Sequence, residues 1–198
     1  MTPTKGNLTA LRRSHILAQQ GFGLMDRKRS ILIREMIGLI KRASEVQRQI
    51  DTVFREAYAA LQAANITLGF CDQIAAAVPV DDTLSVRYRS VMGVEIPAVS
   101  HPEETPRPEY GLTDSDSSLD DAYIKFLRVK RLAGVLAELE NTIYRLANAI
   151  IKTQKRANAL QNIIIPGQER NIKYIEDALE EKDREDFIRL KVIKEGRG

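Results

Sequence analysis

Apolar side chains recur at alternating steps of three and four residues along the first third of the chain. This stripe runs from Leu8 to Ala64, and only His15 and Arg29 interrupt it with polar groups. Such spacing is typical of the seam of a left-handed coiled coil, where each helix turns one narrow apolar face to a partner. It predicts one long helix over residues 5–64. The predicted seam of this helix includes Leu32, Met36, Leu39, Val46 and Ile50.

The same spacing returns in the last part of the chain, from Val129 to Ile164. Beyond it, Pro166 removes one backbone donor and the phase of the apolar stripe drifts. Because helical spacing resumes at once, we predict a helix over residues 121–195 with a kink near Pro166 rather than a stop. The predicted seam of this second helix includes Leu136, Leu139, Ile143, Ile150 and Leu160.

Two seams of similar length on one chain pair most simply with each other, and a long connection lets them run antiparallel. We therefore expect an all-α fold: a long antiparallel two-helix left-handed coiled coil, formed by the N- and C-terminal helices, with a small inserted middle region. That middle region covers residues 65–120, whose composition differs from that of the two helices.

Within the middle region, residues 67–77 are expected to form a short helix that ends before Pro79. Residues 84–99 alternate apolar and polar side chains and predict a β-hairpin, with Gly93 interrupting the run. Residues 101–118 are rich in proline, serine and acidic groups, and they are expected to be a loop or disordered.

The composition fits long solvated helices better than a globular core. Charged residues make up 29% of the chain and aromatic residues 6%, and there is no tryptophan. The net charge of +3 conceals an asymmetry, since residues 1–60 carry +6, residues 61–120 carry −7 and residues 121–198 carry +4. If the two ends pair, one end of the molecule is basic.

The cysteine content and the length of the apolar runs indicate in which cellular compartment the protein lies. The single cysteine, Cys71, has no partner for an internal disulfide, which suits a reducing compartment. No apolar run approaches the roughly 18 residues of a membrane span, and the N-terminus lacks the apolar core of a signal peptide. We expect a cytoplasmic protein without membrane insertion.

Motifs for chemistry are absent from the sequence. It contains no phosphate-binding GxxxxGK[ST] loop, no HExxH, no CxxC and no GxSxG. We therefore expect no catalytic residues, no bound cofactor and no metal site. His15 is most simply a tolerated polar seam residue; the alternative is a pH-sensitive or partner-contacting role. Arg29 is a residue type that can fix coiled-coil register at a cost in stability.

Basic clusters recur along the first helix, at Arg12-Arg13, at residues 27–29 and at Lys41-Arg42. They are either a solvated helix face or a nucleic-acid contact, but no interleaved aromatic residues support the second interpretation. The mixed charges of residues 180–186 (EEKDRED) predict ion pairs on the surface of the second helix.

The C-terminal segment carries the most specific motif. Residues 155–166 read KRANALQNIIIP, residues 172–175 read IKYI, and residues 179–194 read LEEKDREDFIRLKVIK. This succession resembles the D-subunit family of V/A-type rotary ATPases, with departures at Ala157 and Gln161. The residues that match the family pattern are Arg156, Asn158, Ala159, Leu160, Ile165, Pro166, Ile172, Tyr174, Ile175, Leu179, Glu180, Glu181, Arg184, Glu185, Phe187, Arg189, Leu190 and Lys191.

The N-terminal segment is similar to the same family. Residues 3–5 read Pro-Thr-Lys, and the family opens with a similar PT[RK] segment. Residues 23–30 read GLMDRKRS, where the family has a basic G…LLKxKRD-like stretch. Met25, Asp26 and Ser30 depart from that stretch. The resemblance in residue type covers roughly residues 3–60 and 125–195. In the middle region only the order of the segments is similar to that of the family.

The resemblance implies a central rotor shaft. The paired terminal helices would insert into the ring of alternating catalytic A and regulatory B subunits. The middle region would bind the small F subunit and dock on the cup-shaped subunit (C/d) that caps the membrane rotor ring. Such a shaft couples ATP synthesis or hydrolysis to proton or sodium transport, holds no active site, and is peripheral to the membrane on the cytoplasmic side.

Exposed basic residues could then slide past acidic loops of the stator, because exposed ion pairs are worth only about 0–1 kcal/mol and break readily. Two alternatives remain: a non-rotary coiled-coil scaffold, which explains the heptads but not the C-terminal motif, and a basic nucleic-acid or anionic-surface binder, which explains only the charge. The expected rotor–stator contact residues are Arg27, Lys28, Arg29, Arg156, Arg184 and Arg189.

Overall fold

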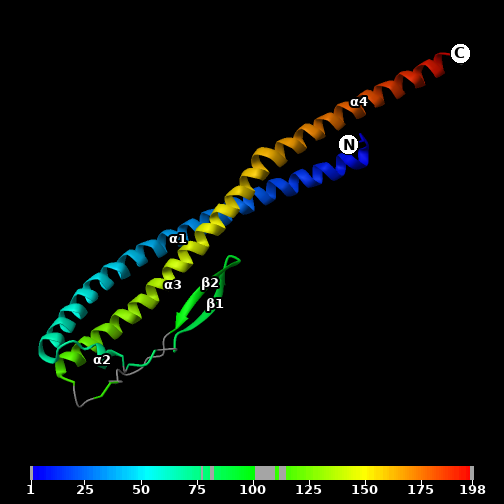
Figure 1. Cartoon of the computed structure of the whole chain (residues 1–198). Coiled ribbons are helices and arrows are strands. Elements are labelled where there is room, and N and C mark those ends of the chain that lie inside the picture. Colours follow the sequence, from blue (N-terminus) through cyan, green and yellow to red (C-terminus); the bar gives the residue numbers. More distant parts are fainter. Residues whose placement is uncertain (1, 77, 81–82, 101–109, 112–114, 197–198) are drawn as a thin grey trace. The chain divides into compact units, whose positions relative to one another are not determined.

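The computed structural model of the chain describes residues 2–76, 78–80, 83–100, 110–111 and 115–196 (Figure 1). It confirms the all-α fold class with a small inserted β-hairpin. The elements are α1 (Lys5–Leu68), α2 (Asp72–Ala75), β1 (Ser85–Val91), β2 (Val94–Ser100), α3 (Ser117–Ala159), a π-helical turn η1 (Leu160–Ile164) and α4 (Ile165–Glu195).

The chain divides into two compact units. The terminal unit consists of residues 1–31 and 150–198, and the central unit consists of residues 32–149. Helix α1 contributes to both units, and so does α3.

Local chemistry fixes both ends of α1. The Thr4 hydroxyl accepts a hydrogen bond of 3.2 Å from the backbone N–H of Asn7, which satisfies a donor of the first turn. At the other end Gly69 adopts a left-handed conformation (φ +79°) and donates its N–H to the Asn65 carbonyl at 3.1 Å. Glycine favours this helix-ending geometry, so α1 continues to Leu68, beyond the predicted limit at residue 64.

Three clusters of buried side chains hold the central unit together, and they show that α1 and α3 run antiparallel. Successive positions along α1 meet successively earlier positions along α3. Burying a large aliphatic side chain contributes about 1.5–3 kcal/mol, so these clusters are the main apolar core of the unit. Their buried members are Val46, Ile50 and Leu139 in one; Val53, Ala57 and Val129 in the next; and Ala64, Cys71, Tyr110 and Leu119 in the last.

The middle region differs from the prediction at both of its ends, because α1 extends to Leu68 and α3 begins at Ser117. The short helix expected over 67–77 is only α2, because α1 takes residues 67 and 68 and Gly69 then ends it. Of the expected loop over 101–118, residues 101–109 and 112–114 lie outside the described residues. Tyr110 is buried, and its hydroxyl donates to the carboxylate of Asp120 in α3.

Strands β1 and β2 form an antiparallel hairpin with a two-residue turn at Met92 and Gly93. Both turn residues have positive φ, 52° and 74°, as a type I′ turn requires. Glycine adopts this conformation easily, whereas a methionine there costs roughly 1–2 kcal/mol. Pro97, within β2, is opposite Tyr88.

The helix of the C-terminal segment continues through Pro166, and the five residues before Ile165 form the π-helical turn η1. In Figure 1 the helix axis changes direction at this place, between the yellow and orange segments. A π turn holds one more residue than an α turn, so it shifts the phase of everything after it by one residue. Accordingly, Ile164 is 42% exposed, and the seam resumes at Ile172 and Ile175.

Candidate functional site: the polar seam and basic residues of the terminal unit

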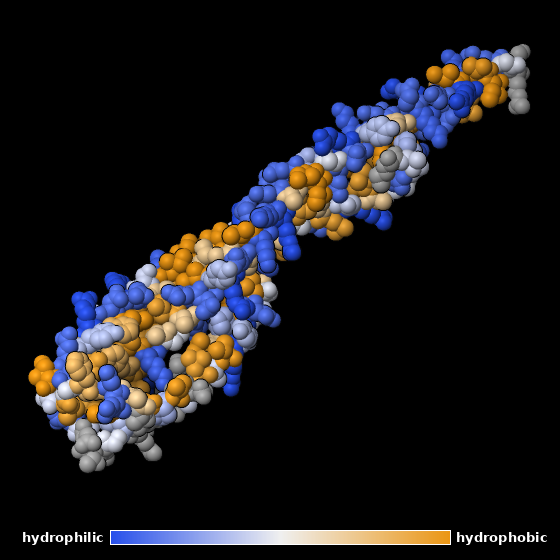
Figure 2. Space-filling view, in the orientation of Figure 1, coloured by the Kyte–Doolittle hydropathy of each residue, from blue (hydrophilic) through white to orange (hydrophobic). Residues whose placement is uncertain are grey.

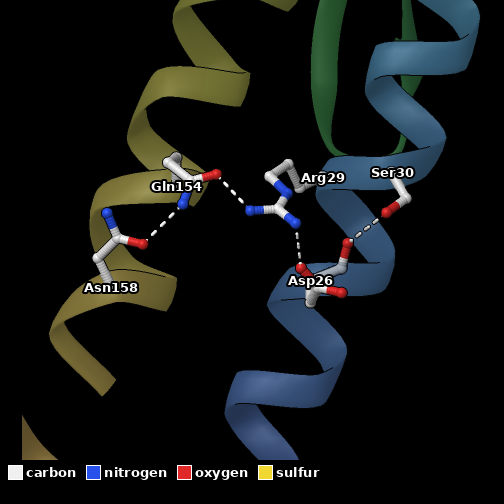
Figure 3. A network of polar contacts seen from close by, with 5 residues as sticks. All are labelled: Asp26, Arg29, Ser30, Gln154 and Asn158. Carbon is white, nitrogen blue, oxygen red and sulfur yellow. Dashed lines mark hydrogen bonds and ion pairs between the residues drawn. The ribbon is translucent and has the colours of Figure 1, made fainter. Parts of the chain in front are cut away.

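A chain of polar contacts centred on Arg29 crosses the seam of the terminal unit (Figure 3). The Arg29 guanidinium donates from Nη1 to Oε1 of Gln154 at 2.5 Å, and from Nη2 to Oδ1 of Asp26 at 2.5 Å. Gln154 in turn donates from Nε2 to Oδ1 of Asn158 at 2.6 Å. The Ser30 hydroxyl donates to the backbone carbonyl of Asp26 at 3.0 Å. Side chains from α1 and α3 thus form one continuous network.

Arg29 occupies a position where the seam of the central unit has apolar residues. Its side chain is 29% exposed, so its charge is only partly solvated. A slip of one helix along the other would separate the guanidinium from Gln154 and leave the charge beside apolar seam positions. Part-buried charges without partners are strongly unfavourable, so this contact favours a single register.

Two departures from the family-like basic stretch coincide with this network. Asp26 supplies the carboxylate that pairs with Arg29, and Ser30 donates to the Asp26 backbone. The family pattern has its acid at the position of Ser30 instead. A carboxylate therefore lies within one helical turn of Arg29 both in this chain, at Asp26, and in the family pattern, at position 30.

A second polar layer lies closer to the chain termini. Gln168 donates from Nε2 to the Ser14 hydroxyl at 2.8 Å, and Nε2 of His15 lies 3.0 Å from the Gln19 amide nitrogen and 3.7 Å from the Glu169 carboxylate. Among the described residues, Nδ1 of His15 and Oε1 of Gln168 are buried without a hydrogen-bond partner. The terminal unit thus has polar groups at two separate levels of its seam.

Ion pairs continue the antiparallel pairing toward the ends. Arg12 contacts Glu176 at 2.5 Å, and Lys5 contacts Asp183 at 3.7 Å. All four groups are at least a third exposed, so each pair contributes about 0–1 kcal/mol. These contacts align α1 with α4 more than they stabilise the pairing.

The six predicted contact residues fall into different surroundings. Arg29 is committed to the seam network. Arg27 and Arg156 are exposed and Lys28 is half-buried, and within the described part of the chain none of these three has an ion-pair partner. They are the members of the set whose charge is available to another molecule.

Arg184 and Arg189 are exposed but paired within α4. Arg184 lies 3.7 Å from Glu180 and 3.6 Å from Glu181, at spacings of four and three residues. Arg189 makes equivalent contacts with Glu185 at 3.5 Å and Asp186 at 3.7 Å. These are the surface ion pairs that the mixed charges of this segment predict.

None of the ten predicted seam residues is exposed. Of these ten, Val46, Ile50 and Leu139 form one buried cluster, with Leu39 and Leu136 packed against it. The buried ones are Leu32, Val46, Ile50 and Leu139, and the half-buried ones are Met36, Leu39, Leu136, Ile143, Ile150 and Leu160.

The sequence interpretation missed the apolar end of α4. Residues 180–196 are all exposed, and they include large apolar side chains (Figure 2). At 3.6 residues per turn these side chains are distributed around the whole circumference of the helix. The signal was present in the run FIRLKVIK. The exposed apolar residues are Phe187, Ile188, Leu190, Val192 and Ile193, with exposed fractions between 56% and 69%.

Two kinds of feature are absent from the described residues. No group of three or more His, Cys, Asp or Glu side chains there could hold a metal ion. Likewise, none of the helices there combines the length and apolar character that a membrane span needs.

Comparison with known proteins identifies the family. The family model described as the D subunit of ATP synthase matches residues 7–195. The V-type ATP synthase D subunit of Thermotoga neapolitana is 41% identical, over 98% of this chain and 97% of the relative. The A-type ATP synthase D subunits of Pyrococcus furiosus and Methanopyrus kandleri are 38% and 36% identical, over 97% and 98% of this chain and 92% and 86% of theirs. The chain therefore belongs to the D-subunit family of V/A-type rotary ATP synthases and is a central-stalk subunit, not a catalytic one.

Proposed function

We propose that this chain is the rotor shaft that transmits torque between a catalytic ring of A and B subunits and a membrane-embedded ion-translocating rotor. Rotation of the shaft would couple ATP synthesis or hydrolysis to proton or sodium transport. The observation that carries this proposal is the seam of the terminal unit, where the Arg29–Gln154 network fixes register. Torque tends to slide one helix along the other, and a register-specific polar layer opposes that motion.

The apolar end of α4 supports insertion into a ring. Large apolar side chains are normally buried, yet Phe187, Leu190 and Ile193 are exposed in the isolated chain, interspersed with basic side chains. A ring of subunits that encloses this end would remove these side chains from water without requiring a docked contact on any one face.

Arg27, Lys28 and Arg156 are proposed to face the stator. Because they have no ion-pair partner within the described chain, acidic stator loops can contact them at each position of the rotation. Exposed pairs are worth about 0–1 kcal/mol, so they break and reform without trapping the shaft. Arg184 and Arg189 would make such contacts by exchanging their partners within α4, whereas Arg29 acts inside the shaft.

The remaining partners follow from the same role. The central unit would bind the small F subunit and dock on the cup-shaped subunit (C/d) above the membrane rotor ring. The complex would hold the chain at the cytoplasmic face of the membrane, peripheral to it. No structural observation favours the alternatives of a non-rotary scaffold or a nucleic-acid binder.

The decisive experiment is assembly. The chain is co-expressed with the A, B and F subunits of its own complex, and native mass spectrometry reports what co-purifies. One copy of this chain and one F subunit within a ring of three A and three B subunits is the expected result. A ring that forms without this chain would contradict the proposal and favour the scaffold alternative.

The contact residues are tested in that complex by reversing charge at Arg27 and Lys28 while Arg29 is retained, because Arg29 is structural. The double change to glutamate should lower ATP-driven torque in single-molecule rotation. A matched control reverses Lys41 and Arg42, which are adjacent, exposed and, within the described part of the central unit, without an ion-pair partner. Equal torque in the two double variants would show that Arg27 and Lys28 do not face the stator.

A further inference from the structure

The hairpin of the central unit has two edges, and its register defines which groups each edge presents. Val91 and Val94 flank the two-residue turn and therefore form a hydrogen-bonded pair. Hydrogen-bonded and non-hydrogen-bonded pairs alternate along an antiparallel ladder. The pairs Ser90–Glu95, Tyr88–Pro97 and Val86–Val99 are thus non-hydrogen-bonded, and their backbone groups point outward.

Helix α3 closes the outer edge of β2 with side chains. The Val99 N–H donates to Oε2 of Glu138 at 2.8 Å, and Nη1 of Arg145 donates to the Glu95 carbonyl at 3.2 Å. Between these two contacts lies Pro97, which has no N–H to satisfy. Figure 1 shows β2 as the strand nearer α3. The Glu138–Arg145 clamp therefore fixes the hairpin to α3.

Arg145 also contacts the other strand. Its guanidinium carbon lies 5.2 Å from the centroid of the Tyr88 ring, within the range of a cation–π interaction. The clamp thus contacts β1 as well as β2, so the whole hairpin moves with α3.

Within the described part of the central unit, the outer edge of β1 is open. The backbone groups of Val86, Tyr88 and Ser90 point away from β2, and among the described residues they meet no hydrogen-bonding group. All three residues are exposed. An uncovered strand edge is a template on which another strand can pair.

We propose that this open edge of β1 pairs with an extended strand of another protein of the rotor, one that carries acidic side chains opposite Arg87 and Arg89. This inference rests on the proposed function. In such pairing the backbone provides affinity and alternate side chains provide specificity. Arg87 and Arg89 are exposed and, within the described chain, without an ion-pair partner. Opposite charges across neighbouring strands stabilise the pairing.

Charge also argues for a foreign strand rather than a second copy of this chain. If the β1 edges of two copies paired, Arg87 and Arg89 of one copy would lie near the same residues of the other. Like charges across neighbouring strands are destabilising. Because the clamp fixes the hairpin to α3, the bound strand must turn with the shaft, which places it in the rotor rather than the stator.

The test separates the backbone N–H from the side chain at Ser90. Ser90→Pro removes the outward N–H, as Pro97 already does on β2, whereas Ser90→Ala retains it. The purified F subunit and the purified cup-shaped subunit are the two probes, each titrated with the full-length chain. Hydrogen–deuterium exchange of the peptide covering β1 is measured with and without each probe.

For one of the two probes, the β1 amides are expected to exchange more slowly in the complex. Ser90→Pro should weaken that affinity by about threefold to tenfold, the value of one net hydrogen bond, while Ser90→Ala leaves it unchanged. Because a proline can disturb the hairpin itself, Arg87→Glu with Arg89→Glu is a second variant that leaves the backbone intact. It should weaken the same complex.

Three results would overturn the inference. One is unchanged β1 exchange in a complex that assembles normally, which leaves the proposed function standing. Another is equal affinity of the wild type, the Ser90→Pro variant and the double glutamate variant. A third is protection of β1 in the chain alone as its concentration rises, which would mean self-pairing. If the wild-type chain fails to enter the rotary complex at all, the proposed function fails and this inference fails with it.

Discussion

The central and terminal units use the same three-four spacing for different purposes. In the central unit the seam is a succession of apolar clusters, such as the one formed by Val46, Ile50 and Leu139. In the terminal unit the equivalent seam contains Arg29 and His15, each with polar partners from the opposite helix. One heptad pattern can therefore provide stability in one part of a coiled coil and register in another.

The difference has a physical cause. Apolar contacts are strong but not directional, so a slip by one heptad keeps most of their free energy. Polar contacts in a partly buried seam contribute little net stability but are lost completely when the partners separate. We expect the central unit to set the free energy of unfolding and the terminal unit to set the alignment of the helices.

The largest expected effect comes from one truncation made in both units. Leu139→Ala, in the central unit, should lower the free energy of unfolding by about 2–5 kcal/mol, as truncation of a buried leucine does. Leu160→Ala, at a half-buried seam position of the terminal unit, should cost roughly half as much or less, because less area is lost. Urea denaturation followed by circular dichroism measures both. Equal losses would break the comparison.

The next effect concerns a buried polar contact of the central unit, between Tyr110 and α3. Tyr110→Phe should lower stability by about 1.5–3 kcal/mol, because it removes a hydrogen bond to the Asp120 carboxylate. Burial first, and then Asp120, raise the pKa of the Tyr110 hydroxyl. In the unfolded chain this tyrosine ionises at about pH 10, whereas in the folded chain it retains its proton at that pH. The free energy of unfolding of the wild type therefore falls as the pH rises above about 10.

The phenylalanine variant supplies the control for this pH dependence. It lacks the ionising group, so the difference in stability between the two proteins should shrink as the pH rises above the unfolded pKa. Denaturant titrations at neutral and alkaline pH measure it. A difference that stays constant would show that Tyr110 ionises alike in both states.

A smaller stability effect is expected at Arg29, with a larger effect on alignment. Arg29→Met should cost about 1 kcal/mol, because it replaces hydrogen bonds by apolar contact in a part-buried site. It should also broaden the distances between spin labels on α1 and α4, since more than one register becomes accessible. Arg27→Met is the matched control and should stay within about 0.5 kcal/mol of wild type. Unchanged distances for Arg29→Met would remove the register role.

The smallest effects should be stabilising and similar in both units. Gly23 and Gly38 lie inside α1, and an added Cβ at either would meet no atom within 4 Å. Replacement of each by alanine should stabilise the chain by about 0.5–1 kcal/mol, because glycine is a poor helix former. Thermal unfolding of the two single variants measures this. A loss of assembly with wild-type-like folding would instead mark a close approach of a partner.

The paired helices could be predicted because the seam has a strict period. Residues such as Val46 and Ile50 recur at steps that only one helical face can satisfy, so their burial follows from spacing alone. The sequence showed that the phase drifts beyond Pro166, but it did not show the π-helical turn at residues 160–164. Residues 163–165 are all isoleucine, so an apolar side chain occupies the seam in more than one phase.

The polar features depended on tertiary placement that spacing does not encode. The sequence grouped Arg27, Lys28 and Arg29 as one basic triplet, but the helix rotates each by about 100°, so only Arg29 meets Gln154. The Glu138–Arg145 clamp joins α3 to a hairpin far from it along the chain. No local pattern relates those residues to β2.

The π-helical turn η1 also affects how the sequence of this helix can change during evolution. One extra residue in a helix would ordinarily rotate everything after it off the seam, and a deletion would do the same in the opposite direction. Here the widened turn absorbs the extra residue, and Ile175 remains fully buried. The segment 160–164 is therefore a place where a lineage can gain or lose a single residue without losing the helix pairing. A one-residue gap at this point between two related sequences would mark a switch between a π turn and an α turn, not the loss of part of the protein.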